Sequence, residues 1–167
     1  MRGILAAAAV VAVLASAPAC DRAAPAGPPA LRLGVDVCDG CGMAIEDPRY
    51  AVAARTDEGA ESRVLKFDDP GCLARWESAA TAAGLRDRWV HDRASGAWID
   101  SGTATFARVN ELVTPMGSGI AAFDSRARAD AAVAEHGGEV MTWEEILGRA
   151  RDGSLAARPD SQSESAR

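Results

Sequence analysis

The order of apolar and polar positions between residues 50 and 95 predicts a hairpin, a helix and a further strand. Three segments rich in apolar and β-branched residues are predicted strands: 50–56 (YAVAART), 63–67 (RVLKF) and 89–92 (WVHD). Asp69 precedes Pro70, a pair typical of a helix N-cap and the first helical position. A helix is therefore predicted from Pro70 to about Ala83, and Gly84 ends it.

The same order of elements recurs farther along the chain. Four segments are predicted strands: 98–100 (WID), 111–113 (ELV), 119–123 (GIAAF) and 139–141 (EVM). Asp124 and Ser125 precede a helix predicted over 126–136, which Gly137 ends. A last helix is predicted over 143–151, beyond the final strand.

Both halves carry a Phe-Asp pair before the helix. Aligning VLKFDDPG with GIAAFDSR places Phe67 on Phe123 and Asp68 on Asp124. We therefore expect an α+β fold in which two ββαβ repeats pack together in one small domain. The expected halves are residues 35–95, with the cysteine motif, and 96–150. With only 5% aromatic residues, neither half is expected to build a robust core alone.

The two ends of the chain differ from this central domain. Arg2 is followed by an apolar run too short to span a membrane and then by SAPAC, so residues 1–19 are predicted to be a lipoprotein signal peptide. Cys20 would then carry the lipid, residues 20–34 would form a flexible tether, and residues 151–167 a disordered tail. We expect an extracytoplasmic protein anchored to the cell membrane by lipid. The alternative is a soluble secreted protein cut near Cys20.

Composition excludes several classes of function. The formal charge is −6 and the basic residues are scattered, which argues against binding to nucleic acid. The sequence has no recognisable hydrolase triad, phosphate loop or nucleotide fingerprint, and its two histidines offer few general bases. We therefore expect a binding protein and not an enzyme.

The four cysteines raise a specific question about unpaired thiols. With Cys20 lipidated, Cys38, Cys41 and Cys72 remain, and an odd number outside the cytosol leaves at least one thiol unpaired. Cys72 lies on the first turn of its predicted helix, where a small buried apolar role is the simpler interpretation and thiol or metal chemistry the alternative.

The motif CDGCGM (38–43) has several possible roles. A redox CxxC needs its first thiolate at a helix N-terminus, and the Asp-Pro pair at 47–48 leaves little room for a helix. Zinc needs four ligands, and the two cysteines would have to be joined by Cys72, His91 or His136. A structural disulfide, or a buried loop of small residues, is the simplest alternative.

Copper(I) would use every sulfur of the motif. It is a soft cation that selects thiolate and thioether ligands. Cys41 and Met43 are two residues apart, so in an extended segment their side chains lie on one face. A third ligand is expected from Met116, which lies in the Pro/Gly turn TPMGSG. The alternative is that Met116 fills a gap between the halves. Met141, in a predicted strand, is expected in the core.

The two histidines have structural alternatives to ligation. His91 follows Trp89-Val90 and is either a ligand or half-buried structure. His136 ends its predicted helix, where it is most simply a charge that complements the helix dipole.

Three segments together resemble the NosL family of accessory lipoproteins of nitrous oxide reductase. They are CDGCGMAIEDPRYAV, KFDDPGCLARW and TPMGSGIAAF, and the likeness covers roughly residues 36–147. The resemblance implies two ββαβ halves and one bound Cu(I). It also implies a metallochaperone that passes copper to the reductase's copper centres with the help of a membrane ABC-type assembly complex.

By the same resemblance, the implied copper ligands are Cys41, Met43 and Met116. Cys38 would be a fourth donor, a capture ligand or the disulfide partner of Cys41 without copper. Two other functions remain as alternatives. One is a thiol-disulfide oxidoreductase tethered to the membrane. The other is an enzyme similar to organomercurial lyase, with Cys38, Cys41 and Asp68 in the reacting roles.

Overall fold

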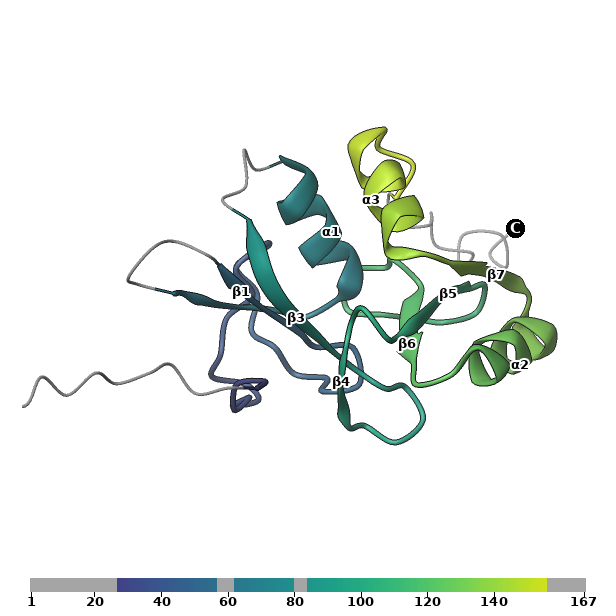
Figure 1. The fold of residues 1–167 in the computed structure, drawn as a ribbon, viewed down its shortest axis with the longest axis horizontal. Coiled ribbons are helices and arrows are strands. Elements are labelled where there is room, and N and C mark those ends of the chain that lie inside the picture. Colours follow the sequence, from purple (N-terminus) through teal and green to yellow (C-terminus); the bar gives the residue numbers. More distant parts are fainter. Residues whose placement is uncertain (1–26, 57–61, 80–83, 156–167) are drawn as a thin grey trace, which may run out of the picture.

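Two antiparallel sheets follow one another along the chain, and three helices pack on them (Figure 1). The computed structural model describes residues 27–56, 62–79 and 84–155. The predicted signal peptide, the predicted lipidation site Cys20, the last turn of the first predicted helix and most of the predicted tail lie outside these residues. Within them, no helix is both long enough and apolar enough to cross a membrane.

The first sheet has the strand order β2-β1-β3-β4. Its strands are β1 (Val52–Thr56), β2 (Val64–Phe67), β3 (Leu85–His91) and β4 (Trp98–Asp100). Val52 of the central strand pairs with Phe67 on one side and with Val90 on the other. Every residue of β1 is buried, so this strand lies at the centre of the first half.

Helix α1 (Pro70–Ala79) begins where the sequence predicts. The Asp69 carboxylate accepts a hydrogen bond of 2.6 Å from the Gly71 backbone N–H, as expected of an N-cap. Its first five residues are buried, because this end of the helix packs against the core. The first turn of α1 therefore has little freedom to move.

The second sheet has the strand order β6-β5-β7 and two helices. Its elements are β5 (Thr105–Val109), β6 (Ile120–Phe123), α2 (Arg126–His136), β7 (Gly138–Met141) and α3 (Trp143–Arg151). The N-cap of α2 is Ser125, as predicted, although its side chain makes no capping hydrogen bond. The Thr142 side chain and Glu145 form a capping box at the start of α3.

The strand predicted at residues 111–113 is wrong. These residues form a turn and loop, and the central strand of the second sheet is β5, which the apolar pattern did not reveal. Val113 is 86% exposed, whereas Phe106, Ala107 and Val109 are buried, so β5 is the segment whose apolar residues reach the core. The predicted strand 98–100 exists as β4, and it pairs with β3 in the first sheet.

Each sheet repeats one order of elements. In the first sheet, β1 lies between β2 and β3, and helix α1 connects β2 to β3. In the second sheet, β5 lies between β6 and β7, and helix α2 connects β6 to β7. This arrangement confirms the α+β fold with a ββαβ order in each sheet. Phe67 and Phe123 end equivalent strands and are both buried.

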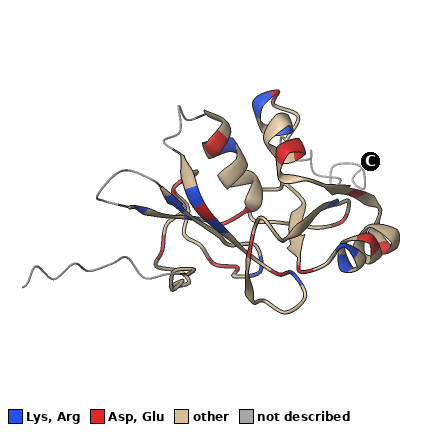
Figure 2. Cartoon of the chain, in the orientation of Figure 1, with Lys and Arg blue, Asp and Glu red and all other residues tan. Residues whose placement is uncertain are grey.

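The two sheets are joined by backbone contacts and a shared core. Asp92 forms a parallel bridge with Ala122, and its carboxylate accepts a 3.0 Å hydrogen bond from the Asp124 backbone N–H. One hydrophobic cluster contains side chains of both halves, among them Phe67, Leu73, Phe106, Ile120 and Ile146. Basic and acidic residues alternate along β3 and lie near one another on the helices (Figure 2), in agreement with the scattered charge of the sequence.

Candidate metal site

The CDGCGM motif folds as a tight hairpin turn. The Cys38 N–H donates to the Met43 carbonyl (2.8 Å), and the Gly42 N–H donates to the Cys38 carbonyl (2.9 Å). Gly42 has φ +79°, which favours glycine. The expectation of an extended segment is therefore wrong, because residues 39–41 turn the chain back on itself.

The three sulfur-containing side chains of this turn differ in exposure. Cys38 is buried, Cys41 is half-buried, and Met43 is 55% exposed. The turn rests on α1, since a Cβ at Gly40 would lie 3.3 Å from the Cys72 carbonyl oxygen. Among the described residues, the first helix begins only at Pro70, so Cys38 and Cys41 are not at a helix N-terminus and lack the helix dipole that a redox CxxC uses.

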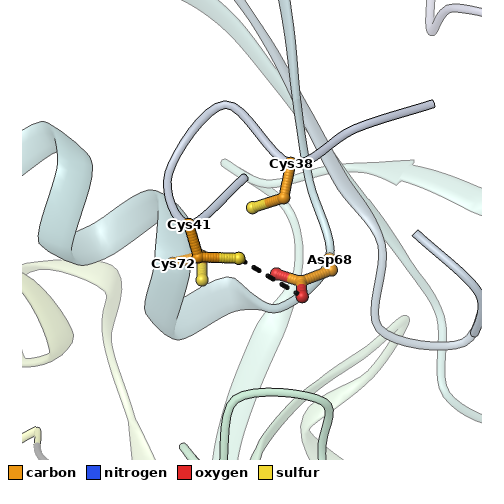
Figure 3. A group of neighbouring side chains, drawn as sticks. All are labelled: Cys38, Cys41, Asp68 and Cys72. Atoms are coloured by element: carbon orange, nitrogen blue, oxygen red, sulfur yellow. Dashed lines mark hydrogen bonds between the residues drawn. The ribbon is translucent and has the colours of Figure 1, made fainter. Parts of the chain in front are cut away.

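Asp68 and Cys72 complete a group of four donors (Figure 3). Asp68 follows the last residue of β2, and Cys72 lies in the first turn of α1. The sulfur atoms of Cys38, Cys41 and Cys72 and a carboxylate oxygen of Asp68 all lie within 4.8 Å of one another. Neighbouring ligands around a tetrahedral Zn–S centre are about 3.8 Å apart, given bonds of about 2.3 Å. A small adjustment would let all four donors bind one ion.

The buried carboxylate of Asp68 supports a metal at this position. Its side chain is 2% exposed; Oδ2 accepts a hydrogen bond of 3.7 Å from the Cys41 thiol, whereas Oδ1 has no partner among the described residues. Burying a carboxylate oxygen without a partner is unfavourable. A cation bound among the thiols would compensate this charge, so the donor set fits a thiophilic metal ion.

The three thiols have different pKa values. Hydrogen bonds from the Cys72 thiol and from the backbone N–H groups of Asp68 and Cys41 lower the pKa of Cys38 to about 6, although burial opposes this shift. The hydrogen bond with Cys38, together with burial, raises the pKa of Cys72. Burial raises the pKa of Cys41. At neutral pH, Cys38 is therefore a thiolate, and the other two thiols lose protons when a metal binds.

An open pocket of about 460 Å³ lies beside these donors and connects the two halves. Its lining residues are Gly40, Cys41, Cys72, Arg75, Trp76, Ala79 and Met116. Met116 comes from the loop before β6, so the second half contributes a thioether to a pocket whose thiols belong to the first. A metal ion among the thiols would be accessible from this side.

The structure thus brings together three of the four predicted ligands. Cys38 and Cys41 belong to the four-donor group, and Met116 lines the adjoining pocket. Met43 lies on the exposed side of the hairpin. Asp68 was not predicted as a metal ligand and Cys72 was predicted only as an alternative, although the spacing FDDPGC places them one helical turn apart around an N-cap.

The other candidate residues lie in structural positions. His91 is buried, its Nδ1 lies 3.0 Å from the Ala51 carbonyl oxygen, and its ring stacks on Trp98 at 3.6 Å between centroids. His136 lies in the last turn of α2 and contacts Glu111 (3.5 Å). Met141 is buried in the core, as predicted.

Comparison with known proteins identifies the family. The NosL family model matches residues 33–150. This chain belongs to the NosL family. A crystal structure described as the copper chaperone NosL from Shewanella denitrificans is similar, with a TM-score of 0.63 and 19% sequence identity over 73% of this chain and 96% of that chain. At this identity the likeness shows a common fold. The search of curated proteins gave no match.

The NosL match confirms the resemblance noted in the sequence. It includes the hairpin from Cys38 to Met43, the Asp68–Cys72 turn and the loop with Met116. Every residue of the candidate metal site therefore belongs to the NosL part of the chain. The predicted lipid attachment at Cys20 precedes that part.

Proposed function

We propose that this protein is a Cu(I) metallochaperone. The observation that carries the proposal is that three thiols and a buried carboxylate meet beside an open pocket that also holds a methionine. Cu(I) selects thiolate and thioether donors, and it accepts two or three of them. The similar structure from Shewanella denitrificans is described as a copper chaperone, which supports the same cargo here.

The openness of the site favours a carrier over a structural metal centre. A structural zinc site is closed by four protein ligands, whereas here Cys41, Cys72 and Met116 line a pocket that opens to the surface. We assign the bound state to Cys41 and Cys72 with Met116, and the Cys38 thiolate lies within 4.8 Å of the other two sulfur atoms. Met43, exposed and two residues from Cys41, is placed to capture the incoming ion or to hand it on.

We further propose that the protein acts outside the cytoplasm, held to the membrane by lipid on Cys20. The short apolar run ending in SAPAC supports this location, and so does the tether that follows it. The recipient we propose is nitrous oxide reductase, whose copper centres would be filled with the help of a membrane ABC-type complex. In this role the chain transfers an ion and catalyses no covalent reaction.

The test is an anaerobic Cu(I) competition titration against a colorimetric chelator. Residues 21–167, which include every described residue, would be compared with the variants Cys72→Ser, Met116→Ala and Met43→Ala. Met141→Leu is the control, since Met141 is a buried core methionine. We expect one Cu(I) per chain, weaker binding in the first two variants and unchanged affinity in the control. Wild-type protein that loses all its copper to the chelator would refute the proposal.

One observation also favours the organomercurial-lyase alternative. The Cys41 thiol donates to Asp68, so a thiol and a carboxylate that could exchange a proton lie side by side. Such an enzyme would release free hydrocarbon from an organomercurial compound. Incubation with a mercurial substrate, with Asp68→Asn as the comparison, decides between the two functions. Binding without turnover supports the carrier.

A further inference from the structure

We propose that Arg75 is the counter-ion of the bound metal–thiolate complex and makes the site selective for Cu(I) over divalent ions. This inference rests on the proposed copper-binding function and names a residue that tunes it. Arg75 acts through Cys72 without binding the metal itself, so it is a positioning and electrostatic residue.

The geometry places the Arg75 guanidinium at the sulfur cluster. Arg75 lies three residues after Cys72 in α1, so both side chains lie on the same face of the helix. Its Nη2 donates a hydrogen bond of 3.5 Å to the Cys72 Sγ, and its Nη1 donates one of 3.3 Å to the Leu155 carbonyl oxygen. The two hydrogen bonds together hold the guanidinium beside the Cys72 sulfur.

The positive charge at this pocket comes from Arg75. Arg75 is the only charged residue among its lining residues in the part of the chain that the structure describes. Two other basic side chains, one on β2 and one directly before it, are already paired with carboxylates of the hairpin region. These pairs are Arg63 with Asp39 (3.0 Å) and Lys66 with Asp36 (2.6 Å).

The charge of the bound metal–thiolate complex explains why Arg75 would favour Cu(I) over divalent ions. Two thiolates around Cu(I) give a net charge of −1, and the nearby Cys38 thiolate and Asp68 carboxylate add further negative charge. The same ligands around a divalent ion give a complex that is one unit more positive. A fixed cation at the sulfur therefore stabilises the Cu(I) complex more than the divalent one, and the effect is strong because the site is partly shielded from water.

The experiment measures the affinities of wild-type residues 21–167, of Arg75→Gln and of Arg75→Lys for Cu(I) and, separately, for Cd(II). The lysine variant keeps the charge. Arg86→Gln is the matched control, since Arg86 is an exposed arginine of β3 that pairs with Asp87. Thermal unfolding of each metal-free protein reports any structural effect of losing the Leu155 contact.

We expect Arg75→Gln to lower the Cu(I) affinity at least tenfold and the Cd(II) affinity by a smaller factor. Arg75→Lys and Arg86→Gln should stay within about threefold of wild type for both ions. Equal losses for Cu(I) and Cd(II) in Arg75→Gln, or no loss for either, would overturn the inference. Wild-type protein that binds Cd(II) and not Cu(I) would instead refute the proposed copper function, so the two failures are distinct.

Discussion

Gly71 controls how closely the first turn of α1 approaches the loop that carries Met116. A Cβ at this position would lie 2.6 Å from the Ser118 Cβ and 2.8 Å from the Asp69 Oδ1. Ordinary contacts of a Cβ are 3.4–4 Å, so the Gly71→Ala variant must push Ser118 away. Ser118 is fully buried, and its hydroxyl accepts a hydrogen bond from the Ile120 backbone N–H (3.2 Å). The loop therefore cannot yield without breaking contacts.

Two opposing contributions determine how much Gly71→Ala changes the free energy of unfolding. Overpacking of a buried contact costs about 1–3 kcal/mol. Alanine in place of a helical glycine gains about 0.5–1 kcal/mol where the site accepts it. Gly148, inside α3, is such a site, because a Cβ there meets nothing within 4 Å. We expect Gly71→Ala to destabilise the protein by about 1–2 kcal/mol, whereas the control Gly148→Ala stabilises it by about 0.5–1 kcal/mol.

Urea unfolding of the metal-free proteins measures both free energies, and an unchanged m-value would show that the comparison is sound. The same displacement moves Met116 away from Cys72, so Gly71→Ala should also weaken Cu(I) binding, and Gly148→Ala should leave it unchanged. If Gly71→Ala proves as stable as Gly148→Ala and binds Cu(I) like wild type, the close packing of α1 on this loop is refuted.

Three further predictions concern the scaffold. Burial lowers the pKa of His91 below 6.5, so the unfolded chain takes up the proton more readily. Stability should fall as the pH drops below 6.5, and pH-dependent urea unfolding should show a weaker fall in His91→Asn. Asp92→Ala removes a buried carboxylate that accepts hydrogen bonds from Ser95 and from the Asp124 backbone N–H, and it should cost about 2–4 kcal/mol in thermal or urea unfolding. The exposed Asp130→Ala, a control, should cost under about 0.5 kcal/mol. Thr142→Ala removes the capping box of α3 and should lower the free energy of unfolding by about 1 kcal/mol, unless the helix is held by packing alone.

Most of the helices and hairpins could be predicted from short stretches of sequence, without knowledge of tertiary contacts. Asp69-Pro70 and Gly137 fixed helix ends, since capping and glycine conformations depend on a few neighbouring residues. The central strand β5 was missed for the opposite reason. Its sequence, TFARV, is a strand because Phe106 and Val109 are buried between β6 and β7, and burial depends on partners distant in sequence.

The candidate metal site also has some features that the sequence predicts and others that depend on tertiary packing. The sequence alone predicted Cys38, Cys41, Met43 and Met116 as sulfur donors and indicated a soft metal, because ligand preference depends on atom type. Only the tertiary structure decided that Cys72 and Asp68 join them, that the motif is a turn, and that Arg75 faces the sulfur atoms. The meeting of Cys41 with Asp68, 27 positions away, depends on the packing of β2 and α1 against the hairpin. Residue types therefore determined which chemistry is possible, and the packing of distant segments decided where the donors meet.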